Sequence, residues 1–174
     1  MITLISATNR PNSWTRKVAE VYRKRLDVKK VEYKFLDLVD LPMDIFNDNM
    51  YSKKSEQFVA IEKEYLIPTT KFIFVIPEYN GSYPGILKLM FDASDIKQCY
   101  HHKKAALIGV SSGRAGNLRG MDDLTNVLNY LKINVLHSKI PISSVEKQFN
   151  DKGELMSKES LRLIDEQIDL LNEM

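Results

Sequence analysis

The chain has 174 residues, of which 44% are hydrophobic and 28% are charged. This length and composition are typical of a globular chain with a full-sized core, so we expect residues 1–174 to form one domain. Lys and Arg number 25 and Asp and Glu number 23, which leaves a net charge of +2. So small a charge argues against a protein whose main partner is a nucleic-acid backbone.

Hydrophobic periodicity predicts strands that alternate with helices along the whole chain. Apolar or alternating runs predict strands, and apolar residues at helical spacing predict helices. In chain order the expected elements are strand 1–6, helix 13–26, strand 31–35, a long loop 37–51, helix 58–65, strand 72–76, helix 84–95, strand 105–110, helix 121–131, strand 135–136 and helix 161–171.

Five repeats of strand and helix, with strands that are apolar throughout, predict a parallel sheet covered by helices on both faces. In such folds, ligands bind beyond the carboxyl ends of the strands. The segments that follow the first, third and fourth strands are therefore the places to look for chemistry.

The first of these segments, ATNRPNSWT at residues 7–15, leads directly into a helix. No glycine precedes Gly81, so this part of the chain has neither a G-x-G-x-x-G nor a Walker A loop. Hydroxyl groups, an arginine and the helix N-terminus offer another way to hold a phosphate. The side chains concerned are Thr8, Arg10, Ser13 and Thr15. The alternative is an ordinary helix cap, made by Asn12 or Ser13 among exposed neighbours.

The second segment, PEYNGSYPG at residues 77–85, contains a turn-forming Asn80-Gly81 pair between two tyrosines. Such a turn is able to present backbone groups to a flat heteroaromatic ring while a tyrosine covers one face of the ring. The alternative is a tight turn with two surface tyrosines, Tyr79 and Tyr83.

The third segment, SSGRAGN at residues 111–117, combines two hydroxyls with two glycines, which allow close approach of a ligand to the backbone. Arg114 lies where it is able to face developing negative charge, and the alternative is a flexible linker into the next helix. Because the three segments meet at one edge of the predicted sheet, together they favour one ligand with a phosphate and a planar ring. A mononucleotide fits this description, flavin mononucleotide (FMN) in particular.

Other features exclude whole classes of function. Cys99 is the only cysteine, so no internal disulfide forms and a reducing compartment is indicated. The three histidines have no metal-ligand spacing. The apolar start of the chain is too short for a signal peptide, and residues 72–77 are too few to span a bilayer. We expect a cytoplasmic protein with no metal site and no membrane or nucleic-acid partner.

On these residues the sequence resembles the NADPH-dependent FMN reductase family, whose fold is flavodoxin-like. ATNRPNS is similar to the family's G-S-x-R-x-x-S phosphate loop, with Ala7 in place of glycine. PEYNGSYPGILK matches P-E-Y-N-x-S-x-P-G-x-L-K almost residue for residue, and SSGRAGNLRG resembles S-x-G-x-x-G-x-x-R/G. The resemblance implies a three-layer α/β sandwich around a five-stranded parallel sheet of order 2-1-3-4-5.

The resemblance also implies roles for individual residues. Those implied for the FMN phosphate are Thr8, Arg10, Ser13 and Thr15, with the backbone N–H of Trp14. Those implied for the isoalloxazine ring are Pro77, Glu78, Tyr79, Asn80, Gly81 and Ser82. Those implied for the far edge of the ring are Ser111, Ser112, Gly113 and Gly116. Ala7 and Asn117 depart from the family pattern, and Ala7 is expected to restrict the phosphate loop.

The implied activity is hydride transfer from NADPH or NADH to bound FMN and then to a small acceptor (a flavin, quinone or azo compound) in a ping-pong cycle. No side chain is expected to act as a catalytic acid or base, because the flavin carries the chemistry. Relatives are commonly dimers or tetramers, so a homodimer or homotetramer is implied. The alternatives are a flavodoxin-type electron carrier, a flavin-free binding module, and a different mononucleotide-dependent enzyme.

Overall fold

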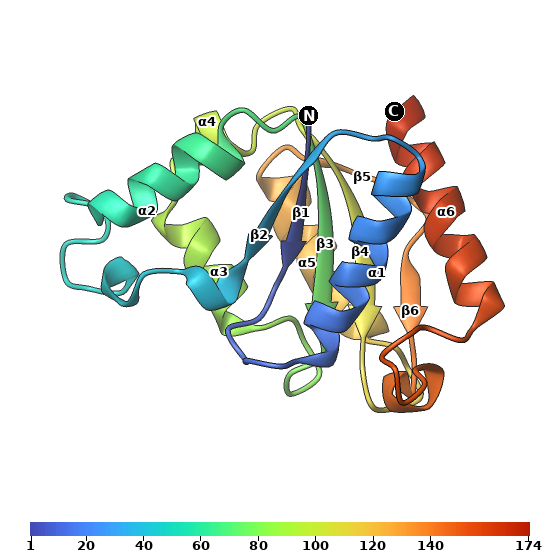
Figure 1. Ribbon diagram of the computed structural model, residues 1–174. Coiled ribbons are helices and arrows are strands. Elements are labelled where there is room, and N and C mark those ends of the chain that lie inside the picture. The colour runs from blue at the N-terminus through green and yellow to red at the C-terminus, as the bar shows by residue number, and fades with distance from the viewer.

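The computed structural model describes residues 1–174 as strands alternating with helices (Figure 1). The strands are β1 (Ile2–Ser6), β2 (Tyr33–Asp37), β3 (Lys71–Pro77), β4 (Lys104–Val110), β5 (Asn134–Val135) and β6 (Ile140–Ile142). The helices are α1 (Trp14–Val28), α2 (Glu56–Ile61), α3 (Gly85–Ala93), α4 (Ile96–Cys99), α5 (Leu118–Tyr130) and α6 (Lys158–Glu173). None of them has the combination of length and apolarity that crossing a bilayer requires.

All strand pairs are parallel, and the order β2-β1-β3-β4-β5 is the flavodoxin-like order that the sequence led us to expect. The sheet nevertheless has six strands rather than five. The last position, expected as a single strand at 135–136, is divided between β5, which pairs with the start of β4, and β6, which pairs with its end.

The side chain of Gln167 in α6 explains how the last strand position of the sheet is divided between β5 and β6. Its side-chain amide donates to the carbonyl oxygens of Leu107, 3.1 Å away, and Ser138, 2.6 Å away. These carbonyls lie where the ladder is interrupted, so a helix side chain satisfies backbone groups that would otherwise be buried without a partner. The division of this strand therefore depends on a contact between residues far apart in the sequence, which periodicity does not reveal.

Alternating residues of the central strands face two separate cores. On one face, Phe72, Phe74 and Ile76 of β3 pack in a core that α3 and α5 share. On the other face, Ile73 and Val75 pack in a core that α1 and α6 cover. The C-terminal helix therefore belongs to the same layered structure as the rest of the chain, on the side of the sheet where α1 lies (Figure 1).

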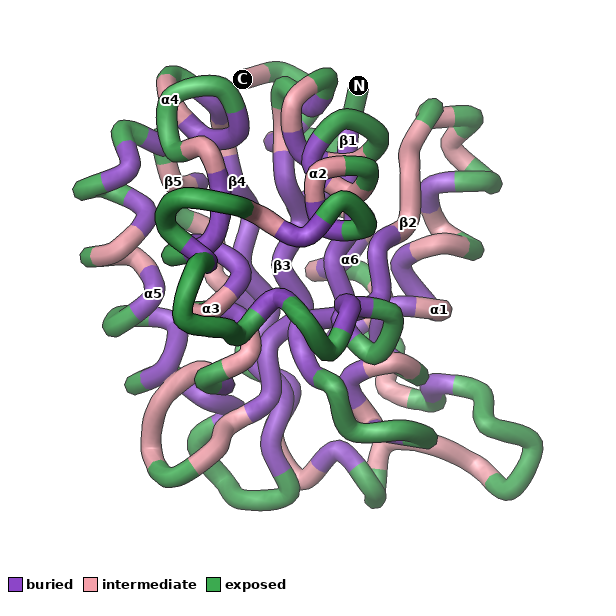
Figure 2. Tube along the Cα trace, turned by 90° about the vertical axis from the view of Figure 1, so that its left-hand side faces the viewer, coloured by how far each residue is buried: buried purple, intermediate pink, exposed green.

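The segment 37–51 forms an exposed loop that is partly structured. It contains two single turns of 3-10 helix, at Leu38–Asp40 and Met43–Ile45. Ile45 and Met50 are buried, which fixes the loop against the body of the protein. Figure 2 shows this loop, largely exposed, running beside α3.

The carboxyl ends of β1, β3, β4 and β6 meet at one edge of the sheet, the lower edge in Figure 1. The loops that the sequence singled out follow three of these four strands. The fold therefore brings them together, as a parallel sheet must when its strands run in one direction.

Candidate functional site

The loop after β1 ends at a helix whose first backbone donors are free. Ser13 caps α1, because its Oγ accepts a hydrogen bond from the backbone N–H of Arg16 at 3.1 Å. The N–H groups of Trp14 and Thr15 donate to no protein acceptor. They are oriented by the helix toward its N-terminal end, where the helix dipole favours an anion.

Two arginines near this helix end differ in what they are free to do. Arg10 is exposed, and its guanidinium has no ion pair or hydrogen bond. Arg16, in contrast, is engaged with Glu20 and with the buried carboxylate of Asp37. Of the two, only Arg10 has its donors available for a ligand.

Thr8 has a different position from the one that a phosphate ligand would need. Its side chain is fully buried, and its Oγ1 lies 2.7 Å from the phenol oxygen of Tyr79 and accepts from the N–H of Arg10 at 3.1 Å. Thr8 therefore joins two loops instead of facing the cavity. The neighbouring Ala7 has no positive φ, so its methyl group fits the loop without backbone strain.

The segment after β3 forms a tight two-residue turn. Asn80 and Gly81 both have positive φ, at 53° and 79°, and Tyr79 and Ser82 exchange backbone hydrogen bonds of 3.0 and 3.1 Å. These are the features of a type I′ turn, which Asn-Gly favours. The Oγ of Ser82 donates to Asp123 of α5 at 2.6 Å, which ties the turn to that helix. The turn thus places Tyr79 while Ser82 is used for anchoring.

The segment after β4 is fixed by a contact within itself and by contacts with β3 and β6. Ser111 donates to the carbonyl oxygen of Gly113 at 3.1 Å. Gly116 has a positive φ of 56°, and a Cβ there would come within 2.5 Å of Pro141, so this glycine allows close packing against β6. Asn117 is buried in the left-handed region, and its side-chain amide donates to Ile76 at the end of β3.

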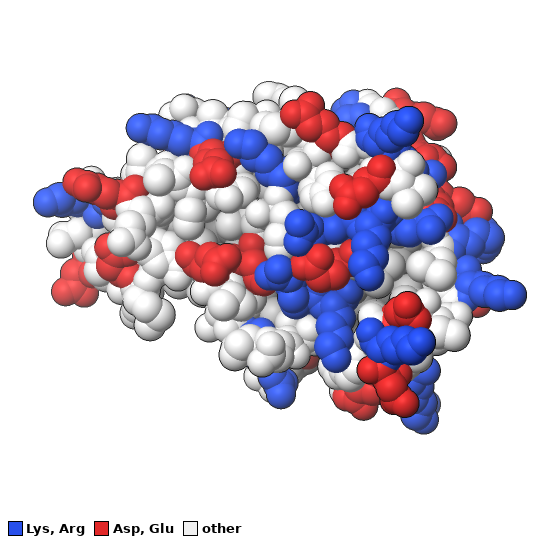
Figure 3. Space-filling model, in the orientation of Figure 1, with Lys and Arg blue, Asp and Glu red and all other residues white.

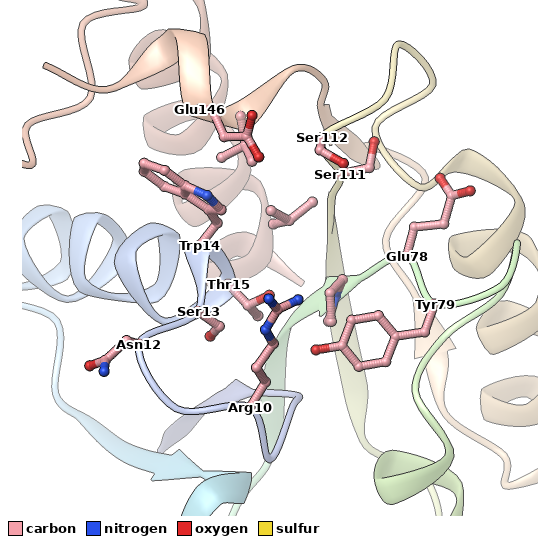
Figure 4. A pocket seen from close by; sticks show the side chains of 13 residues that line it. Arg10, Asn12, Ser13, Trp14, Thr15, Glu78, Tyr79, Ser111, Ser112 and Glu146 are labelled. Atoms are coloured by element: carbon pink, nitrogen blue, oxygen red, sulfur yellow. The ribbon is translucent and has the colours of Figure 1, made fainter.

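These loops surround a cavity of about 230 Å³ at the carboxyl edge of the sheet (Figure 4). In Figure 4, Arg10 and Tyr79 point toward one another at one side of the cavity, and Trp14 and Glu146 lie at another. The lining residues are Arg10, Asn12, Ser13, Trp14, Thr15, Pro77, Glu78, Tyr79, Val110, Ser111, Ser112, Val145 and Glu146.

Nine of the fifteen site residues expected from the sequence line this cavity. The six that do not are Thr8, Asn80, Gly81, Ser82, Gly113 and Gly116. Five of these six have identifiable structural roles: Thr8 and Ser82 tie loops together, Asn80 and Gly81 form the turn, and Gly116 allows close packing against β6. The motif residues therefore divide into some that face the cavity and others that shape its walls.

Sequence reasoning missed the segment after β6, which supplies Val145 and Glu146 to the cavity. Backbone hydrogen bonds from Ser144 to Gly113, at 2.9 Å, and from Val145 to Ser111, at 3.1 Å, hold this segment against the loop after β4. Because β6 itself was not predicted, nothing in the sequence marked these residues as belonging to the same edge.

Comparison with known proteins agrees with this geometry. The sequence profile of the NADPH-dependent FMN reductase family matches residues 1–147, which include every residue that lines the cavity. The chain belongs to the NADPH-dependent FMN reductase family. Membership makes it an oxidoreductase of a family whose cofactor is FMN and whose reductant is NAD(P)H.

Individual proteins are similar to this FMN reductase family member at low sequence identity. An NAD(P)H-dependent FMN reductase of Pseudomonas aeruginosa is 29% identical over 140 residues, which cover 78% of this chain and 76% of the relative. A quinone reductase of Pseudomonas putida is 24% identical over 161 residues, which cover 90% and 85%. The solved structure of FerB, a flavoenzyme NAD(P)H:(acceptor) oxidoreductase from Paracoccus denitrificans, superposes with a TM-score of 0.79 at 21% identity and covers 99% and 97% of the two chains. That structural likeness confirms the fold.

Proposed function

We propose that this protein binds FMN in the cavity at the carboxyl edge and uses it to pass electrons from NAD(P)H to a small organic acceptor. The observation that carries the proposal is the composition of the cavity wall. Free backbone donors at the start of α1 lie on one side, and an unpaired arginine lies on another beside Tyr79, which a tight turn holds in place. This pattern suits a ligand with a phosphate at one end and a flat ring at the other.

The residues present fit an FMN phosphate. The N–H groups of Trp14 and Thr15 would donate to its oxygens at the start of α1, and Arg10 would add a charge-assisted hydrogen bond. The hydroxyl of Thr15 lines the same wall. Ser13 faces the cavity too, while its Oγ is engaged in capping α1.

The ring of the flavin would lie against the segment 77–79 and the loop after β4. Tyr79 would cover part of the ring, and Ser111 and Ser112 would face its polar edge. Asn80, Gly81 and Gly113 would act through the shape that they give to these loops. Bound FMN supplies the redox chemistry, since it accepts two electrons as a hydride and delivers them to a second substrate.

The protein's own contribution is to bind and orient, and we assign no side chain as a catalytic acid or base. We propose that NAD(P)H and the acceptor occupy the same open side of the cavity in turn, which gives ping-pong kinetics. A quinone is the acceptor class that we favour. Its support is the similarity over 90% of the chain to a protein named as a quinone reductase.

We also propose that the protein self-associates, through the face around α3. Apolar side chains are exposed on the loop beside this helix, where Met43 is 94% and Phe46 is 76% exposed. A hollow of about 340 Å³ lies on the other side, between α3 and α5, with Phe91 and Ile96 in its wall. Exposed apolar surface of this kind is typical of an interface. A molecular mass of one chain, about 20.1 kDa, in solution would contradict the proposal.

We also propose that the protein is cytoplasmic. The support for this location is its one cysteine, Cys99, which is a free and buried thiol. Such a thiol is compatible with a reducing compartment. Fractionation of the source cells would test this, and recovery of the protein outside the cytoplasm would contradict it.

The experiment that tests the function has two stages. Titration of the purified protein with FMN, followed by quenching of flavin fluorescence, measures binding. Steady-state assays with NADPH or NADH and a soluble benzoquinone then vary both substrates. The proposal predicts saturable FMN binding and parallel double-reciprocal lines. Binding without nicotinamide oxidation would identify a carrier instead, and no FMN binding would identify a flavin-free module.

A further inference from the structure

The arginines of this chain fall into two groups by what they contact. Four of the seven form ion pairs with carboxylates: Arg16, Arg23, Arg25 and Arg162. Figure 3 shows the consequence over α1, where basic side chains are gathered but lie among acidic ones. The remaining three, Arg10, Arg114 and Arg119, have no ion pair and no side-chain hydrogen bond. All three lie at the carboxyl edge of the sheet.

Arg114 lies on the loop after β4, and Arg119 follows five residues later in the first turn of α5. Both are exposed, as is Leu118 between them in the sequence. Neither lines the cavity, so they lie outside the space that we assign to FMN. The loop that carries Arg114 also supplies Ser111 and Ser112 to the cavity wall, so the two arginines adjoin that site.

The acidic groups nearest along α5 are already engaged. Asp122 accepts from Lys139 at 2.8 Å, and Asp123 accepts from Ser82 at 2.6 Å. The first turn of α5 contains no acidic residue, and no side chain caps it. Neither guanidinium group therefore forms an ion pair with a carboxylate of the protein, and the helix end beside them adds to the positive potential.

Two guanidinium groups without an ion pair, on neighbouring turns of the chain, suit a dianionic ligand group. A phosphate monoester carries nearly two charges at neutral pH, because its second pKa is about 6. Each phosphorus of a pyrophosphate bridge carries only one charge. The guanidinium group of arginine also binds phosphate oxygens in a bidentate geometry, which lysine does not provide.

We propose that Arg114 and Arg119 bind the 2′-phosphate of NADPH and so give this protein a preference for NADPH over NADH. This assignment rests on the proposed use of NAD(P)H at the neighbouring cavity. It concerns binding alone, because the 2′-phosphate is present in NADP⁺ as well as in NADPH and takes no part in hydride transfer.

The test compares the double variant Arg114→Ala/Arg119→Ala with the wild type. Isothermal titration calorimetry measures the Kd values of NADP⁺ and NAD⁺, and steady-state kinetics measure KM for NADPH and NADH. Arg162→Ala is the matched control, because it removes an exposed arginine from α6, where it pairs with Glu166. The variant Arg114→Lys/Arg119→Lys keeps both charges and loses the paired donors.

The assignment predicts that the wild type binds NADP⁺ at least about tenfold more tightly than NAD⁺, as expected for charge-assisted hydrogen bonds to one phosphate. In the double alanine variant the Kd of NADP⁺ should rise about tenfold or more, and that of NAD⁺ less than about twofold. The lysine variant should fall between the two, and Arg162→Ala should match the wild type.

Three results would overturn the assignment. Equal losses for both nucleotides would mean that the arginines hold the shared pyrophosphate. An unchanged preference together with a shifted flavin midpoint potential would mean that Arg114 acts on the flavin. Equal affinities in the wild type would remove the preference itself. Loss of FMN binding by the wild type would count against the proposed function, whereas the NADP⁺ and NAD⁺ titrations decide this assignment either way.

Discussion

The phenol oxygen of Tyr79 lies 2.7 Å from the hydroxyl oxygen of Thr8, and this hydrogen bond joins the loop after β3 to the loop after β1. The first loop carries the groups that we assign to the FMN phosphate, and the second carries those that we assign to the ring. Thr8 is fully buried, so the bond is held in place by the core. This hydrogen bond thus connects the two ends of the proposed flavin site.

Breaking this connection should weaken FMN binding without removing any group that we assign to the ligand on the phosphate side. We expect Thr8→Val to raise the FMN Kd about threefold to tenfold, since one hydrogen bond contributes about 1 kcal/mol net. Tyr79→Phe should have a similar effect, and the double variant should be no worse than the poorer single variant. Fluorescence titration of the three variants checks this. Additive losses would show that the two residues act independently.

Arg10 should contribute to the binding of the FMN phosphate and not to the binding of the rest of the flavin. We expect Arg10→Ala to raise the FMN Kd by about tenfold to a hundredfold, the range for a lost charge-assisted hydrogen bond. Riboflavin lacks the phosphate, so its affinity should stay within about twofold of the wild-type value. Titration with both flavins checks this. An equal loss for the two would place Arg10 away from the phosphate. The paired Arg23, on the exposed side of α1, offers a control as Arg23→Ala.

The turn at Asn80-Gly81 should be intolerant of a side chain at its second position. Gly81 has φ of 79°, so Gly81→Val places a β-branched residue in the left-handed region even though open space surrounds it. We expect a loss of stability of about 1–2 kcal/mol and a weaker FMN complex. Thermal unfolding and FMN titration measure the two effects. Gly153→Val is the control, since Gly153 also has positive φ and open surroundings but lies outside the loops that surround the cavity. A fall in FMN affinity in that variant as well would separate the effect from the site.

Cys99 should make the stability of the folded protein depend on pH in the alkaline range. Burial, together with the neighbouring carboxylate of Glu62, raises the pKa of its thiol from 9.0 to about 12. The Cys99 thiol of the unfolded chain therefore ionises near pH 9, whereas the thiol of the folded chain keeps its proton. The contribution of this thiol to the free energy of unfolding is complete below pH 9 and is lost as the pH rises toward 12. Between pH 8 and about pH 11 the wild type should lose more stability than Cys99→Ala, as measured by urea unfolding. Parallel curves for the two proteins would contradict this.

Much of this fold could be predicted from the sequence because the decisive signals are local. Residues 72–76 form an unbroken, β-branched and aromatic apolar run that is typical of a strand buried on both faces. The Asn80-Gly81 pair encodes its own turn. The failures share a cause in contacts between distant segments. Gln167 allows the last strand to divide, and the segment after β6 brings Glu146 to the cavity, yet neither has a local pattern.

Prediction of the site was limited in the same way, because the site also depends on contacts between distant segments. A motif identifies which residues belong together, but it does not say which of them face a ligand. Thr8 and Ser82 have hydroxyls that suit a ligand, and both are used to tie loops together. Which way a hydroxyl points depends on its neighbours across the sheet edge, and these neighbours come from other strands.

Reduction of the bound flavin by NADPH can be observed directly. The protein, loaded with FMN and freed of oxygen, is mixed rapidly with NADPH while the visible absorbance of the flavin is followed. We expect the bound flavin to lose its visible absorbance within the time of a catalytic turnover, with one NADPH consumed for each FMN. Bound flavin that keeps its absorbance in the presence of NADPH, or a protein that takes up no FMN before mixing, would contradict this expectation.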